Sequence, residues 1–141
     1  MYSQLIKTQE QAIAHLFIHC CYKNGKFTEE ELDAVSGIFV MLGMQHELNF
    51  TEELQGYRSY ISETENEETY LQYLVSLVLP ADELALYSYC VELCVSDSLI
   101  DATEVTLLQH LGTVLSITEE DQALIQKLTV QRRLVFTQKY F

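Results

Sequence analysis

One segment of this chain occurs twice, 73 positions apart, and that repeat limits the folds open to it. Residues 21–44 (CYKNGKFTEEELDAVSGIFVMLGM) align without a gap with residues 94–117 (CVSDSLIDATEVTLLQHLGTVLSI). Few positions are identical, but apolar residues fall on apolar residues, as where Leu32 aligns with Val105. Both copies place apolar residues at steps of three and four, the period of a helix with one buried face. The sequence therefore predicts two copies of a helix–turn–helix pair.

The rest of the chain is also expected to be helical, because helix-breaking residues are scarce. It contains one proline, Pro80, and five glycines. Apolar periodicity predicts seven helices, near residues 3–22, 29–43, 51–61, 64–79, 82–96, 102–115 and 119–128. The expected fold is one all-α domain over residues 1–141, with pseudo-symmetric halves at about 10–50 and 83–128 and a basic C-terminal tail at 129–141.

The charge balance excludes several classes of partner. The chain has 8 Lys and Arg residues against 21 Asp and Glu residues, a net charge of −13. Sequence-independent nucleic-acid binding depends on basic contacts to phosphate, and anionic membrane surfaces also attract basic residues, so neither partner is expected. Other proteins are the expected partners, bound through the acidic face or the basic tail.

The compartment is expected to be the cytoplasm. The N-terminal residues lack the basic and apolar regions of a secretory signal. The longest apolar run, residues 37–44, is far short of the roughly 18 residues that a membrane span needs. Cys20 and Cys21 are adjacent, and Cys90 and Cys94 are four residues apart, a spacing unlike a secreted disulfide framework. Reduced thiols in a cytoplasmic protein follow from this pattern.

The basic residues of the C-terminal segment allow two interpretations. All acidic residues lie within residues 1–121, whereas residues 122–141 contain four basic residues and no acidic one: Lys127, Arg132, Arg133 and Lys139. The favoured interpretation is a tail docked on the acidic body of its own chain, with Leu134, Val135 and Phe136 as the apolar contact. The alternative is a tail that binds a partner.

Each copy of the repeat contains a corner between two helices, and helix-capping rules explain most of its sequence. Thr28 and Glu31 in the first copy, and Asp101 and Glu104 in the second, have the spacing of a capping box. In that motif the first side chain accepts a hydrogen bond from a backbone N–H in the first turn, and the Glu accepts one from the N–H of the capping residue. Both corners are therefore expected to start helices.

The second corner holds more negative charge than capping requires. Asp97 is expected near the C-terminal end of the preceding helix, where the helix dipole disfavours an anion by roughly 0.3–1 kcal/mol. Together, Asp97, Asp101 and Glu104 would bring three carboxylates to one turn, where they repel one another unless a cation compensates them. Hard cations such as Ca²⁺ or Mg²⁺ prefer such oxygen ligands, although the spacing is not that of an EF-hand loop. These residues are candidate ligands of a divalent cation.

The first corner carries fewer carboxylates at the equivalent positions. Asn24, Thr28 and Glu31 stand there, so only one of the three is acidic. If the two halves meet face to face, Glu31 and Asn24 would complete one shared cation site with the acidic residues of the second corner. The alternative is that both corners are purely structural.

The duplicated corner resembles a motif of the TerB-like family of bacterial tellurite-resistance domains. The matching stretches are residues 24–31 and 97–104, and Leu42-Gly43 closes the first copy. The resemblance implies an all-helical domain of two pseudo-symmetric halves in the bacterial cytoplasm. It also implies a role in stress and metal-ion response, an acidic site proposed to bind metal, and no enzymatic activity.

The chain departs from that family pattern at one position in each corner. Asn24 stands where the motif has Asp, and Ser98 stands where it has Gly. The first departure argues against two equal metal sites and makes the second corner the better candidate.

A zinc site is a further alternative. His15 and His19 are four residues apart on one expected helix, and Cys90 and Cys94 have the same spacing on another, so a site with two His and two Cys ligands is conceivable. Against it, the two histidines continue a polar stripe with Gln11 and Lys23, which is typical of a solvated helix face. Buried thiols, moreover, behave as small apolar side chains.

The sequence favours a non-enzymatic module that binds proteins or metal ions in stress defence. It contains no GxGxxG or GxxxxGK[ST] phosphate loop and no GxSxG elbow. The alternatives are a pure protein-interaction module without metal and a small enzyme of unknown chemistry.

Overall fold

The computed structural model describes residues 1–22, 28–95 and 100–141. Over these residues the chain forms eight α-helices, two short 3₁₀ helices and no strand, which confirms the expected all-α fold. The helices are α1 (Tyr2–Leu5), α2 (Gln9–Cys21), α3 (Glu29–Met41), η1 (Met44–His46), α4 (Phe50–Tyr60), η2 (Ile61–Glu63), α5 (Glu67–Val78), α6 (Glu83–Cys94), α7 (Ala102–Val114) and α8 (Glu119–Gln138). In the same part of the chain, none of these helices combines the length and apolar character needed to cross a bilayer.

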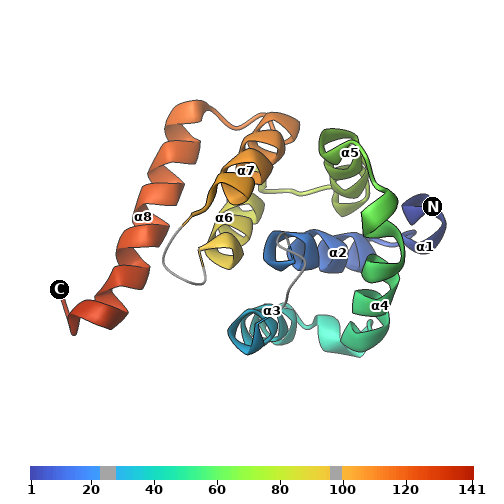
Figure 1. Ribbon diagram of the computed structural model, residues 1–141, viewed down its shortest axis with the longest axis horizontal. Coiled ribbons are helices and arrows are strands. Elements are labelled where there is room, and N and C mark those ends of the chain that lie inside the picture. The colour runs from blue at the N-terminus through green and yellow to red at the C-terminus, as the bar shows by residue number, and fades with distance from the viewer. Residues whose placement is uncertain (23–27, 96–99) are drawn as a thin grey trace.

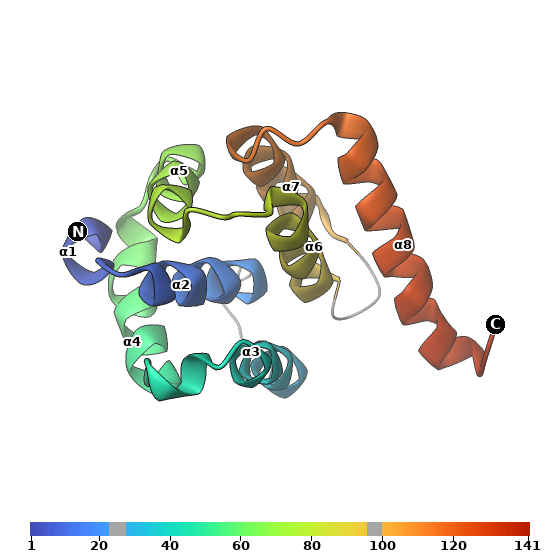
Figure 2. The same cartoon turned by 180° about the vertical axis from the view of Figure 1, so that it is seen from behind.

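Helix α2 lies at the centre of the molecule (Figure 1). It packs against α3, α4, α5 and α6, and residues 14–21 are all buried. Helices α6 and α7 pack against each other on one side of it, and α8 lies beyond them at the outer edge, as the reverse view in Figure 2 also shows. The central position of α2 explains why its polar residues, described below, must find partners inside the protein.

The first predicted helix is divided in two. Ile6 is extended and fully buried, and Thr8 begins a new helix with a capping box. The Thr8 hydroxyl accepts a hydrogen bond from the backbone N–H of Gln11 at 3.1 Å, and the Gln11 side chain accepts one from the N–H of Thr8. This T-x-x-Q capping signal lies inside an otherwise periodic stretch, so periodicity alone predicted one continuous helix.

The predicted C-terminal tail is helical as far as Gln138, because residues 129–138 contain no glycine or proline to end α8. Arg132 approaches Glu92 of the acidic body at 4.0 Å, with both side chains largely exposed. The expected apolar docking is wrong for Phe136, which is 78% exposed, and for Leu134, which is 36% exposed. Only Val135 of the three is half-buried.

The two copies of the repeat have the same local structure. Helices α3 and α7 begin and end 73 positions apart, and both start with the predicted capping box. The backbone N–H of Glu31 donates to the Thr28 hydroxyl at 3.1 Å, and that of Glu104 donates to the Asp101 carboxylate at 2.9 Å. After each helix the chain turns through a left-handed residue, Gly43 with φ 75° and Ser116 with φ 58°.

This left-handed position predicts opposite effects of substitution in the two copies. A residue with a Cβ pays roughly 1–2 kcal/mol to be left-handed, and glycine does not, although glycine loses more entropy on folding. We expect Ser116→Gly to raise the free energy of unfolding by about 0.5–1 kcal/mol. Gly43→Ala should lower it by about 1 kcal/mol through the backbone alone, since no atom lies within 4 Å of the added Cβ. Urea denaturation measures both, and a destabilised Ser116→Gly would contradict the assignment.

Candidate functional site

The polar stripe of α2 is buried, not solvated. His15 is 1% exposed and His19 is 6% exposed, so the prediction of a solvent-facing stripe is wrong for both. Each imidazole uses both of its nitrogens: one meets a tyrosine hydroxyl of α4, and the other meets a glutamate. The stripe faces other polar groups of the protein, and the described part of the chain leaves no buried side-chain nitrogen or oxygen without a partner.

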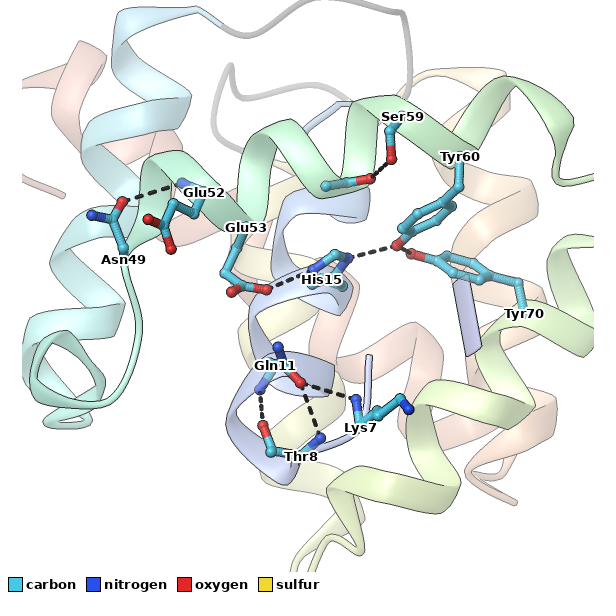
Figure 3. A network of polar contacts seen from close by, with 11 residues as sticks. Lys7, Thr8, Gln11, His15, Asn49, Glu52, Glu53, Ser59, Tyr60 and Tyr70 are labelled. Carbon is cyan, nitrogen blue, oxygen red and sulfur yellow. Dashed lines mark hydrogen bonds and ion pairs between the residues drawn. The ribbon is translucent and has the colours of Figure 1, made fainter. Parts of the chain in front are cut away.

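Burial lowers the pKa of His15 and favours its neutral ring, and the bonds around that ring fix its tautomer. Its Nε2 lies 2.9 Å from Glu53 Oε1, and its Nδ1 lies 2.6 Å from the hydroxyl of Tyr60 (Figure 3). An ionised carboxylate only accepts hydrogen bonds, so Nε2 carries the proton and donates to Glu53. Nδ1 of the neutral ring then accepts from Tyr60. The Tyr60 oxygen lies 2.5 Å from that of Tyr70, which therefore donates to Tyr60 and ends the chain of bonds.

A second chain of bonds runs from His19 to the surface. The Tyr57 hydroxyl lies 2.7 Å from His19 Nδ1, and His19 Nε2 lies 2.8 Å from Oε2 of Glu67. The other oxygen of this carboxylate, Oε1, lies 2.8 Å from Nδ1 of His110 on α7. By the same reasoning both imidazoles donate to Glu67. This carboxylate, at the first residue of α5, thus joins α2, α5 and α7.

Helical spacing places the partners of α2 on one face of α4. Glu53, Tyr57 and Tyr60 are separated by four and three residues, opposite His15 and His19 at a spacing of four. Tyr57 and Tyr60 are buried, which confirms the expected core position of these aromatics, and burial raises the pKa of both hydroxyls. The sequence therefore contains two polar stripes of matching spacing, one on each helix. Only the packing of α4 on α2 shows that the two stripes bond to each other.

An open groove of about 630 Å³ lies between the N-terminal turn of α5 and helix α7. It is lined by Glu65, Asn66, Glu67, Ala102, Thr103, Thr106 and His110. Among the described residues, its ionisable groups are thus two carboxylates and one imidazole. The groove is where the second chain of hydrogen bonds reaches solvent, since Glu67 and His110 belong to both.

His110 turns one unbonded ring nitrogen toward this groove. Its Nδ1 donates to Glu67, and within the described residues its Nε2 has no hydrogen-bond partner. The side chain is 35% exposed. The hydroxyl of Thr106, one turn before it, already donates to the carbonyl of Ala102. The arrangement can accept hydrogen bonds from a ligand beside two carboxylates.

The predicted cation ligands are only partly within the described structure. Asn24 and Asp97 lie outside the described residues. Asp101 and Glu104 form the capping box of α7, and Glu31 forms that of α3. Where the structure describes the chain, it places no three His, Cys, Asp or Glu side chains so that they could hold a metal ion.

The two corners nevertheless act on a common neighbour. Burial is the main cause that raises the pKa of the Cys21 thiol, and the negative charges of Glu31 and Glu104 raise it further. Glu31 lies in the first turn of α3, and Glu104 lies in the first turn of α7, the equivalent helix of the other copy. Their shared influence on Cys21 indicates that both corners lie near the end of α2.

The alternative zinc ligands are used otherwise. The ring nitrogens of His15 and His19 bond to α4 and α5, and the Cys94 thiol donates weakly to the carbonyl of Cys20 at 3.8 Å. All four cysteines are buried and unbridged. Contact with Cys90 and burial raise the pKa of Cys20 well above its ordinary value. The thiols therefore behave as the small apolar side chains expected of them.

Comparisons of the chain with protein-family models, with curated proteins and with solved structures gave no match. The resemblance to the TerB-like family rests on the corner motifs alone.

Titration of His15 should make stability depend on pH. Burial lowers its pKa below the ordinary value of 6.5, against the opposing effect of Glu53. Below that pH the unfolded chain therefore binds more protons than the folded one, and the free energy of unfolding falls as the pH falls. Between about pH 7 and pH 5.5 we expect a loss of up to about 1.4 kcal/mol per pH unit, measured by urea denaturation.

A pair of variants isolates this effect. His15→Gln should lower stability at pH 7 but flatten its pH dependence, because the titrating group is gone. His46→Gln removes an exposed imidazole and should leave the slope unchanged. Equal slopes in wild type and His15→Gln would contradict the assignment of a neutral, buried His15.

Proposed function

We propose that this chain is a non-enzymatic, cytoplasmic protein-interaction module that holds a Lys- or Arg-bearing segment of a partner in the groove between α5 and α7. The observation that carries the proposal is the carboxylate of Glu67, which His19 and His110 fix at the edge of this groove at 2.8 Å each. A fixed acceptor costs less entropy to use than a mobile one, which is the advantage of preorganisation.

The charge of the groove favours a basic ligand. Glu65 and Glu67 supply two carboxylates, and the imidazole of His110 lies next to them. Lysine and arginine side chains carry donors only and match this set of acceptors. The surrounding protein adds to the attraction, since residues 1–121 contain all 21 acidic residues of the chain.

A binding role fits the groove better than a catalytic one. The Glu67–His110 pair could serve as a base, but a nucleophilic enzyme also needs a hydroxyl or thiol directed at that base. The two described hydroxyls that line the groove are engaged elsewhere: Thr106 donates to the carbonyl of Ala102, and Thr103 donates to the Asp101 carboxylate at 2.6 Å. The cysteines are buried away from the groove.

Binding of a short fluorescent peptide of alternating Lys and Gly tests this proposal by anisotropy. Glu65→Gln should weaken binding about five-fold, near 1 kcal/mol, because Glu65 is exposed and its loss removes a carboxylate of the groove without touching the buried network. The matched control is Glu47→Gln, an exposed carboxylate after η1 with the same change in charge. Equal weakening by both variants would mean that only net charge attracts the peptide, and would refute a groove site.

A divalent cation at the two corners is a second proposal, and its support is the carboxylates that the sequence gathers there, with Glu31 and Glu104 at the starts of α3 and α7. Asp97, Asp101 and Asn24 would complete its ligands, and Ca²⁺ or Mg²⁺ are the ions that suit oxygen donors. A role in bacterial stress response is also part of this second proposal. It is supported by the resemblance to the TerB-like family alone.

Calorimetry with Ca²⁺, Mg²⁺, Mn²⁺ and Zn²⁺ tests the cation site. Glu104→Gln should abolish heat of binding with little loss of stability, because a Gln at this position still completes the capping box. Glu119→Gln, in the first turn of α8, is the control and should bind as wild type does. If the wild-type protein gave no heat of binding with any of these ions, the cation site would be refuted.

A further inference from the structure

The chain beyond the last turns of α8 carries a cation between uncovered aromatic rings. Lys139 directly follows the last residue of the helix, and its ammonium group forms no ion pair with any residue that the structure describes. Phe136 is 78% exposed and Tyr140 is 82% exposed. Aromatic side chains bury large areas when a partner covers them, and they are enriched at protein interfaces. Residues 136–141, called the end segment below, therefore have the composition of a binding segment.

The end segment complements the charge of the groove between α5 and α7. Residues 122–141 contain four basic residues and no acidic one. The starts of the two helices that form the groove carry five carboxylates, at Glu65, Glu67, Glu68, Asp101 and Glu104. Each helix N-terminus contributes about half a positive elementary charge, so five full negative charges outweigh both of them. The groove therefore attracts a lysine side chain.

The end segment of a chain lies on a different part of the molecule from that chain's own groove. Helix α8 packs on α6, whereas the groove lies between α7 and α5. The C-terminal end of α8 is at one end of the molecule, and α5 lies toward the other end, with α6 and α7 between them (Figures 1 and 2). Because Lys139 follows the helix directly, α8 determines where this lysine lies. A groove that receives it must belong to another molecule.

We propose that copies of this chain associate head to tail, with Lys139 of one copy bound in the groove of the next. The inference rests on the proposed function of the groove and names its partner, a second copy of this chain. The ammonium group of Lys139 donates to the carboxylates of Glu65 and Glu67, and the ring of Tyr140 covers the apolar part of the lining at Ala102. The end segment and the groove are different surfaces, so each copy offers one of each and the contact is heterologous.

The geometry on both sides favours this contact, and its small size limits its strength. Glu67 is held by His19 and His110 at 2.8 Å each, and the end segment starts from a helix of 20 residues. Groups that are positioned before they meet lose less entropy on binding. A standard interface, however, uses about 20–30 residues on each side, far more than the end segment contains. We therefore expect a dissociation constant between about 10 μM and 1 mM.

Sedimentation equilibrium of the full chain tests the association. In about 0.1 M salt the Debye length is about 10 Å, so the long-range repulsion between two copies of net charge −13 is largely screened. The wild type should pass from monomers to dimers or longer chains as its concentration rises from about 10 μM to 1 mM. Lys139→Glu reverses the charge of the end segment, and Glu65→Lys reverses one charge of the groove. Each variant alone should associate about ten-fold more weakly or less.

Matched controls carry the same changes at other exposed positions. Lys7→Glu lies between α1 and α2, and Glu47→Lys follows η1. Both should associate as the wild type does, and far-UV circular dichroism checks that all four variants are folded. Net charge alone predicts a different result, because Glu65→Lys makes the chain less negative by two charges and would then strengthen the association.

A mixture of the two variants gives the sharpest measurement. Lys139→Glu retains an intact groove, and Glu65→Lys retains an intact end segment, so one molecule of each can form a single contact. We expect the equimolar mixture to form a 1:1 heterodimer with the affinity of the wild-type contact and nothing larger. A mixture that stays monomeric at concentrations where the wild type associates would overturn the assignment of the two surfaces.

Failure of this inference can be told apart from failure of the proposed function. A wild type that stays monomeric up to about 1 mM would overturn the head-to-tail contact. If the Lys-Gly peptide still bound and Glu65→Gln still weakened it, the groove would keep its proposed function and only the named partner would be wrong. If association depended on Lys139 but not on Glu65, the end segment would bind elsewhere, which would also overturn the inference.

Discussion

The structure depends on two imidazoles that the central helix carries into the core. A buried polar group that lacks a hydrogen-bond partner costs roughly 1–3 kcal/mol, so His15 and His19 require both a donor and an acceptor each. Helix α4 supplies the two tyrosines and Glu53, and α5 supplies Glu67; α4 buries only two of its own residues, Tyr57 and Tyr60. The packing of α4 on α2 is thus specified by directional bonds, which allow one register where purely apolar contacts would tolerate several.

The same constraint connects the core to the surface. Glu67 receives one imidazole from the interior and one from the groove, so its position is determined from both sides. A carboxylate in the first turn of a helix is already favoured by the helix dipole, so the two imidazoles add position to what the dipole gives in energy. The groove is consequently rigid at the point where a ligand would meet it, although its other carboxylate, Glu65, is exposed.

The sequence predicted those features that depend on neighbouring residues. The all-α fold, the corner capping boxes at Thr28 and Asp101, and the end of α5 before Pro80 all follow from short-range rules. The buried histidines could not be predicted in this way. A polar stripe at helical spacing is equally compatible with water and with a second polar stripe, and the partners of His15 are 38 and 45 positions away. The helix predicted over residues 119–128 continues to Gln138, because the residues expected to form a tail contain no glycine or proline that would end it.

Salt should separate the two roles of the glutamates at the groove. A basic peptide in the groove is attracted by exposed charges that salt screens, so its affinity falls as the Debye length shrinks below about 10 Å. The bond between His19 and Glu67, at 2.8 Å and largely shielded from solvent, is screened much less. Moderate salt should therefore release the peptide and leave the carboxylate of Glu67 in place, because the network that positions it belongs to the fold and not to the ligand.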